Sequence, residues 1–210
     1  MENKNHVIIA LDGLEEALAL RFAEILSPSV WGFKVNDLLF ADPHVIGRIK
    51  RFSNVFADAK LYDIPHTVKN SVRRLVDAGA DLITVHASGG VEMMRIAKEN
   101  SSECKIIAVT VLTSTETNIH EVERLVKDAI EAGVDGIVCS GNDLKAISKI
   151  PGAKSLLKVV PGIRPTWYDK TDDQKRIATP QAAIDAGADF IVIGRPVLEA
   201  PDPVEAVKNL

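Results

Sequence analysis

The stretch "EAGVDGIVC" at residues 131–139 contains the pattern that decides the fold, and two other stretches resemble it: "DAGADLITV" at 77–85 and "DAGADFIVI" at 185–193. Each reads as the end of a helix, a glycine that stops the helix in the left-handed conformation, an aspartate and a short β-rich run. The run is apolar on successive residues, which is typical of a strand buried on both faces. A helix–glycine–strand unit that occurs three times predicts βα units repeated along the chain.

The rest of the chain fits this unit. Helical patterns separate eight candidate strands at 6–11, 31–35, 54–60, 81–86, 105–111, 135–140, 157–162 and 189–194. Eight alternating units predict an α/β protein, a single-domain (β/α)8 TIM barrel over residues 1–210. An open doubly wound sheet is the alternative. The first strand, however, is followed by "LDGLEE" and not by the glycine-rich turn common in that fold.

Composition narrows the function classes. The net charge is −4, with no acidic or basic block, so we expect no nucleic-acid partner. No apolar run approaches the roughly 18 residues of a membrane span, and the N-terminal run before Asp12 lacks the features of a signal peptide. Cys104 and Cys139 are too few for a disulfide framework and lack metal-ligand spacing. We therefore expect a cytoplasmic protein with no membrane contact.

A barrel places its active site at the carboxyl ends of its strands, where "DAKLYDI" (58–64) puts three charges. Alternation along a strand points Asp58 and Lys60 the same way, and Lys34 ends the preceding strand. Asp63 lies just past the strand, so two lysines and two carboxylates are expected to converge, with the lysines protonated and the aspartates ionised. A structural ion-pair network is the alternative. Burying four charges costs several kcal/mol each, which favours a site in which Lys60 donates a proton.

A second group of residues follows strands seven and eight, where barrels often bind phosphate. Here "VVPGIRP" contributes Pro161 and Arg164, and "VIGRPV" contributes Gly194 and Arg195. Glycines allow a close backbone approach, and arginines can fork onto phosphate oxygens. Turn glycines with solvent-facing arginines are the alternative. The stretch 163–180 between them has no clear periodicity and is a candidate lid.

Taken together, several motifs resemble the orotidine 5′-phosphate decarboxylase family, most closely its bacterial-type branch. They are "ALD" (10–12), "FKV" (33–35), "DAKLYDIPHTV" (58–68), "TVLTS" (110–114), "PGIRP" (161–165), "DQKR" (173–176) and "IGRP" (193–196). The resemblance implies a homodimeric barrel that decarboxylates orotidine 5′-monophosphate to UMP in pyrimidine biosynthesis, without a metal or a cofactor. Asn36, Tyr62 and His66 depart from the residues common in the family at these positions.

The resemblance also implies roles for individual residues. Lys34, Asp58, Lys60 and Asp63 match its charged catalytic array, and Asp12 and Lys34 match groups that hold the ribose. Asp63, Ile64 and Thr67 match residues that enter the partner subunit's site. Thr113 matches a contact to the pyrimidine, and Arg164, Gln174, Gly194 and Arg195 match the phosphate grip and its lid.

Two alternatives remain. A Mg²⁺-dependent sister enzyme, such as hexulose-phosphate synthase or a sugar-acid phosphate decarboxylase, shares the D-x-K-x-x-D core. Asp58 and Asp63 could hold Mg²⁺ in another arrangement, but Lys60 between them and Lys34 beside them argue against a cation there. A non-catalytic phosphate-binding barrel is the other alternative, and the intact charged set argues against it.

Overall fold

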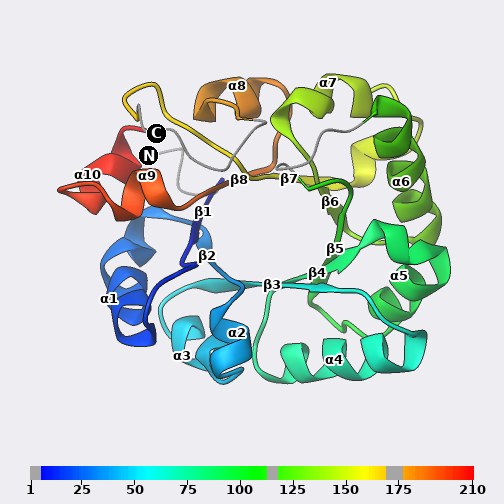
Figure 1. The fold of residues 1–210 in the computed structure, drawn as a ribbon, viewed down its shortest axis with the longest axis horizontal. Helices are drawn as coiled ribbons and strands as arrows, with labels where there is room; N and C mark the ends of the chain where they lie inside the picture. Colours follow the sequence, from blue (N-terminus) through cyan, green and yellow to red (C-terminus); the bar gives the residue numbers. More distant parts are fainter. Residues whose placement is uncertain (1–5, 113–117, 169–176) are drawn as a thin grey trace.

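The structure is a computed structural model that describes residues 6–112, 118–168 and 177–210. Its eight strands are β1 Val7–Ala10, β2 Gly32–Val35, β3 Asn54–Leu61, β4 Leu82–His86, β5 Lys105–Val109, β6 Gly136–Val138, β7 Leu157–Val160 and β8 Phe190–Ile193. All are parallel, and β1 pairs with both β2 and β8, so the sheet closes on itself (Figure 1). The predicted barrel is confirmed, and the open-sheet alternative is wrong.

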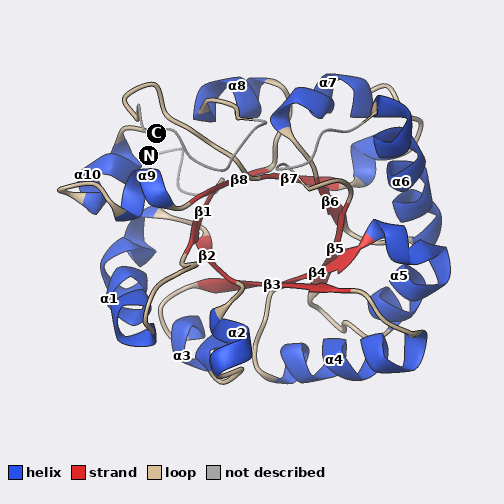
Figure 2. Ribbon diagram, viewed as in Figure 1, coloured by secondary structure: helices blue, strands red, loops and turns tan. Residues whose placement is uncertain are grey.

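The helices form a ring outside the strands (Figure 2). They are α1 Glu16–Leu26, α2 Leu38–Ala41, α3 Val45–Lys50, α4 Pro65–Asp77, α5 Gly90–Glu99, α6 Ile119–Ala132, α7 Leu144–Ile147, α8 Pro180–Asp185, α9 Arg195–Leu198 and α10 Pro203–Lys208. Short 3-10 turns stand at η2 Ser27–Ser29, η3 Ala87–Gly89, η4 Gly141–Asp143 and η5 Ala153–Ser155. In the described ranges, no helix combines the length and the apolar character needed to span a bilayer.

The barrel has two apolar cores. Side chains inside the barrel form a small cluster of Ile8, Phe56, Leu82, Ile107, Val159 and Val192. A larger cluster fills the layer between the strands and the helices. The amphipathic α6 shows how the layers join, because its buried residues Val122, Leu125, Val126 and Ala129 recur at helical spacing.

The repeated glycine–aspartate motif closes the amino-terminal end of the barrel. Gly133 ends α6 in the left-handed conformation, with φ 72°. The carboxylate of Asp135 then accepts a hydrogen bond of 2.8 Å from the N–H of Ile106, on the preceding strand. Asp81 does the same for Val55 at 2.8 Å, and Asp189 for Lys158 at 2.7 Å. Each repeat thus uses its aspartate to join the start of one strand to the start of the strand before it.

Most predicted strands extend a residue or two past the observed ones. The run 157–162 shows one reason: β7 stops at Val160, and Gly162 takes a left-handed conformation, φ 74°, that turns the chain out of the sheet. Pro65 begins α4 at the first helical position, a favoured place for proline. These turns at the carboxyl ends of the strands surround the pocket described next.

Candidate active site

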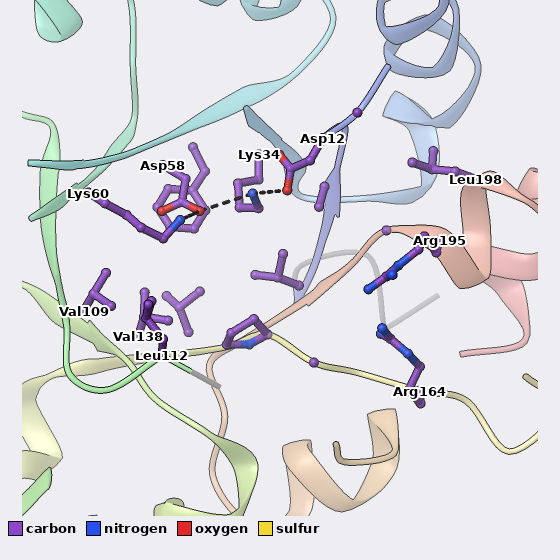
Figure 3. Close-up of a pocket in the computed structure, with 18 of the residues that line it drawn as sticks. Asp12, Lys34, Asp58, Lys60, Val109, Leu112, Val138, Arg164, Arg195 and Leu198 are labelled. Carbon is purple, nitrogen blue, oxygen red and sulfur yellow. Dashed lines mark hydrogen bonds and ion pairs between the residues drawn. The ribbon is translucent and has the colours of Figure 1, made fainter. Parts of the chain in front are cut away.

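A pocket of about 520 Å³ opens at the carboxyl ends of the strands. Four of its charged side chains come from three consecutive strands: Asp12 follows β1, Lys34 lies on β2, and Asp58 and Lys60 lie on β3. Figure 3 shows these side chains on one side of the pocket and Arg164 and Arg195 on the other. The volume falls in the range of small-molecule sites, about 300–1,000 Å³.

The four charges form an alternating chain. Lys34 Nζ lies 2.5 Å from Asp12 Oδ2 and 3.2 Å from Asp58 Oδ2, and Lys60 Nζ lies 2.6 Å from the same Asp58 oxygen. The side chains of Lys34 and Asp58 are only 10% and 9% exposed. Each buried charge is therefore paired, which is the condition for holding ions in an apolar interior.

The pairing sets the protonation states. Burial by itself would lower the pKa of Lys34, but the carboxylates of Asp58 and Asp12 outweigh burial and raise that pKa above its ordinary value. Burial would likewise raise the pKa of Asp58, but the Lys34 and Lys60 ammonium groups outweigh it and hold the pKa below its usual range. At neutral pH the site therefore contains ammonium and carboxylate groups, the forms expected from the alternation of charge.

Strand β3 is distorted where it carries these groups. Ala57 pairs with Ile83 and Leu61 pairs with Val85, so three β3 residues stand opposite the single β4 residue Thr84. Within this bulge Lys60 has φ 45°, a left-handed conformation that costs a non-glycine residue on the order of 1–3 kcal/mol. Asp58 and Lys60 face the same pocket, as predicted, but they do so from a bulge and not from a regular strand.

Two polar side chains that the sequence analysis did not select bracket the bulge. The Thr84 hydroxyl accepts a hydrogen bond from the Lys60 N–H at 2.8 Å and donates one to Asp58 Oδ1 at 2.9 Å. From the other side, Asn36 Nδ2 donates to the Asp58 carbonyl oxygen at 2.6 Å. A threonine inside the apolar run "DLITVH" was a signal for the first of these contacts, because a fully buried hydroxyl needs a partner.

Asp63, Ile64 and Thr67 do not join the array of their own chain. All three are exposed, and Asp63 Oδ1 accepts a hydrogen bond of 2.7 Å from the Ile64 N–H. Within residues 6–112, 118–168 and 177–210, no ion pair involves Asp63. In a single chain, therefore, Asp12 and not Asp63 is the second carboxylate that pairs with the lysines.

The candidate phosphate end lies across the pocket from the lysines. Pro161, Arg164, Gly194 and Arg195 all line it. A side chain at position 194 would crowd β1, since a Cβ there would lie 3.2 Å from the Ala10 carbonyl oxygen. Thr113 and Gln174, expected at the pyrimidine and the phosphate, lie outside the described residues.

Backbone hydrogen bonds join the two ends of the candidate lid 163–180. The Arg164 N–H donates to the Ala178 carbonyl at 2.9 Å, and the Ala178 N–H donates to the Gly162 carbonyl at 3.3 Å. The Arg164 guanidinium also lies 5.6 Å from the centre of the Tyr168 ring. The arginine is thus anchored at the base of this stretch, beside the pocket.

Apolar residues that no sequence motif singled out form the inner surface of the pocket. They are Ala10, Phe56, Val109, Val138, Val159 and Val192. Their inward positions near the ends of successive strands were the available signal. The pocket thus combines an apolar floor, an acid–lysine array on one wall and two arginines on the other.

The fold and this pocket define a (β/α)8 barrel with a charged site at the carboxyl ends of its strands, the place where barrel enzymes act. Residues 5–210 match the model of the "Orotidine 5'-phosphate decarboxylase / HUMPS family". The chain belongs to this family.

Named relatives agree with the assignment. The orotidine 5′-phosphate decarboxylase of Anaeromyxobacter dehalogenans is 41% identical, covering 100% of this chain and 98% of the relative. That of Psychromonas ingrahamii is 40% identical, covering 97% and 94%. The crystal structure of orotidine 5′-phosphate decarboxylase from Lactobacillus acidophilus superimposes with a TM-score of 0.81 and 33% identity, over 98% of this chain and 96% of that one.

Proposed function

We propose that this chain decarboxylates orotidine 5′-monophosphate to UMP and CO₂ in pyrimidine biosynthesis, and that residues 1–210 act as one catalytic domain. The observation that carries the proposal is the alternating chain Asp12–Lys34–Asp58–Lys60 inside the pocket. Membership of the family and the names of its relatives point to the same activity.

The reaction needs a cation where negative charge develops. Loss of CO₂ from C6 of the pyrimidine leaves a vinyl carbanion that the ring delocalises poorly. The Lys60 ammonium stabilises this charge and then supplies the proton that forms UMP. Asp58 holds the ammonium in place at 2.6 Å, and Lys34 in turn balances the charge of Asp58. Asp12 and Lys34 are proposed to hold the ribose.

The phosphate is remote from the reacting carbon. We assign it to Arg195, Gly194 and Arg164, on the wall opposite the array. Pro161 and Gln174 complete this end in the proposal, and Thr113 contacts the pyrimidine. Binding energy from a non-reacting group can organise the site for the transition state, so the phosphate is expected to raise turnover as well as affinity.

We further propose a homodimer in which Asp63, Ile64 and Thr67 complete the partner's site. Asp63 is exposed and its Oδ1 accepts the Ile64 N–H, which supports a role outside its own chain. Helix α2, which follows β2, and the loop after β3 also expose large apolar side chains: Phe40 is 80%, Tyr62 63% and Ile64 66% exposed. Such side chains at one end of a barrel favour burial against a second copy.

The two lysines make the array a poor site for the cation that the Mg²⁺-dependent alternative requires. Asp58 Oδ2 contacts both lysine ammonium groups, and Asp58 Oδ1 accepts the Thr84 proton. Magnesium prefers oxygen ligands in an octahedral arrangement, and neighbouring ammonium groups repel it. We therefore propose that the reaction uses no metal and no cofactor.

We also propose that the protein acts in the cytoplasm, because its two buried cysteines are free thiols, which fits a reducing compartment.

The test is the loss of orotate absorbance when orotidine 5′-monophosphate is mixed with the protein in the presence of EDTA. Equal turnover with and without the chelator supports the proposal. Turnover that EDTA abolishes and Mg²⁺ restores would favour the metal-dependent sister reaction. Binding of the nucleotide without any turnover would favour the non-catalytic alternative.

A further inference from the structure

The bulge in β3 poses a structural problem that its neighbours must solve. Three residues of β3, Asp58 to Lys60, stand opposite one residue of β4, so the backbone hydrogen bonds of a regular ladder cannot form there. Lys60 moreover takes a left-handed φ of 45° without being glycine. Such a conformation persists only where surrounding contacts hold it.

The Thr84 hydroxyl provides two of these contacts at once. It accepts the Lys60 N–H at 2.8 Å, in place of a ladder carbonyl, and it donates its single proton to Asp58 Oδ1 at 2.9 Å. Thr84 is fully buried, with 0% of its surface exposed, so water cannot easily replace the hydroxyl. A hydroxyl is the smallest group that can accept one bond and donate the other.

The geometry of Asp58 depends on the same hydroxyl. Oδ1 is directed to Thr84, which leaves Oδ2 for both Lys34 Nζ at 3.2 Å and Lys60 Nζ at 2.6 Å. Rotating the carboxylate would weaken all these contacts together. Asn36 holds the Asp58 carbonyl from the β2 side but touches neither carboxylate oxygen.

We propose that Thr84 is a positioning residue, whose hydroxyl orients the Asp58 carboxylate and fixes the left-handed Lys60 backbone so that the Lys60 ammonium faces the pocket. The inference rests on the proposed decarboxylase function. It assigns Thr84 no contact with the substrate. Loss of the hydroxyl should therefore impair the chemical step and leave substrate binding nearly unchanged.

The test compares kcat and KM for orotidine 5′-monophosphate in three variants. Thr84→Val keeps the shape and removes the hydroxyl, and we expect kcat to fall about 100-fold, as misplacing a catalytic group by about 1 Å does. We expect KM to stay within about threefold of wild type, because Asp12 still holds Lys34 at 2.5 Å and the two arginines lie on the opposite wall of the pocket (Figure 3). Thr84→Ser keeps the hydroxyl and should retain kcat within about fivefold.

Ser101→Ala is the matched control for losing a buried hydroxyl. Ser101 is 0% exposed, and its hydroxyl donates to the Lys98 carbonyl at 3.0 Å, in the turn between α5 and β5 at the opposite end of the barrel. This variant should melt at a lower temperature yet keep the wild-type kcat. With that result, a loss of kcat in Thr84→Val is not a general effect of removing a buried hydroxyl.

The outcomes separate the two proposals. If the wild-type protein shows no turnover, both the proposed decarboxylase function and the proposed role of Thr84 are wrong. With an active wild type, a wild-type kcat in Thr84→Val, an equal loss of kcat in Thr84→Ser, or a loss confined to KM would overturn the role of Thr84 alone. If Thr84→Val does not fold, Thr84→Ala replaces it. The smaller alanine leaves room for a water that partly replaces the hydroxyl, so we expect kcat to fall about tenfold. An unchanged kcat in Thr84→Ala would overturn the proposed role of Thr84.

Discussion

Lys34 and Asp58 form a buried ion pair at the mouth of the barrel, with 3.2 Å between Lys34 Nζ and Asp58 Oδ2. Neither side chain is more than one-tenth exposed. Each has a second partner, Asp12 for Lys34 and Lys60 for Asp58, so the pair is the centre of a longer chain of charges. Because desolvating such charges is costly, the array points to a functional site more than to a source of stability.

The first prediction concerns Lys60. Lys60→Ala removes the proposed proton donor but leaves the buried Lys34–Asp58 pair intact. We expect nearly complete loss of turnover with a folded protein, measured by orotate absorbance and by circular dichroism. A kcat near the wild-type value in this variant would rule out the proposed mechanism.

The second prediction concerns the dependence of stability on pH. The pKa of Asp58 is lower in the folded chain than in the unfolded one, so its contribution to stability is present above the unfolded value of about 4 and is lost as the pH falls through the folded value. Asp58→Asn should therefore lose less free energy of unfolding on acidification than the wild type does, measured by urea unfolding.

At neutral pH the same variant should be less stable than the wild type, by about 3 kcal/mol, because Lys34 and Lys60 lose their shared carboxylate. At high pH, Lys34 makes stability depend on pH in the opposite direction. Its raised pKa means that its contribution is complete below about 10.4 and is lost as the pH rises through the folded value. Identical acid dependence in Asp58→Asn and the wild type would contradict the prediction.

The third prediction concerns the phosphate. Arg195→Ala should lower kcat/KM for orotidine 5′-monophosphate. The expected loss of transition-state stabilisation is roughly 2–5 kcal/mol, by analogy with truncating one partner of a buried charged pair. Orotidine, which lacks the phosphate, should be affected far less by the same change. Equal losses with the two substrates would show that Arg195 does something other than bind phosphate.

The sequence predicts the fold because the same physical unit is repeated. In three of the units a glycine ends a helix, an aspartate follows, and a strand that is apolar on both faces begins. Helical patterns separate the remaining candidate strands, and eight alternating units leave little choice of architecture. The positions of Asp58, Lys60, Lys34 and Asp12 follow from the barrel, since the ends of its strands meet.

Other features could not be predicted from the same reasoning. Nothing in "DAKLYDI" marks Lys60 as left-handed, because lysine has no preference for that conformation and the bulge is stabilised by Thr84 and Asn36 from other strands. Contacts between residues more than 20 positions apart depend on the register of the strands. The alternation of side chains along a strand does not predict that register once a bulge is present.

The fourth prediction tests the structural motif at the other end of the barrel. Asp135→Ala leaves the Ile106 N–H without its acceptor and should lower the free energy of unfolding by about 1–3 kcal/mol. Asp135→Asn is the control. It keeps an oxygen acceptor and loses only the ion pair with the partly exposed Lys98, which contributes about 1 kcal/mol or less. Both variants should retain wild-type kcat/KM. Equal destabilisation by alanine and asparagine would show that the backbone hydrogen bond contributes little.

The last prediction concerns the shared site. If each site uses its own Lys60 and the partner's Asp63, then Lys60→Ala and Asp63→Ala proteins are both inactive alone. A heterodimer of the two has one site with both defects and one with neither. Random exchange of equal amounts makes about half of the dimers heterodimers, so about a quarter of all sites should recover.

Subunit exchange can be promoted by mild denaturant followed by dilution, since dimer formation depends on concentration. Differently tagged variants, purified through both tags, would isolate the heterodimer and establish that it forms. Its activity should then approach half that of the wild type, because one of its two sites is intact. An inactive heterodimer would place Asp63 in the site of its own subunit. That outcome would require the loop after β3 to turn inward, since Asp63 Oδ1 otherwise accepts the N–H of Ile64 at the exposed rim.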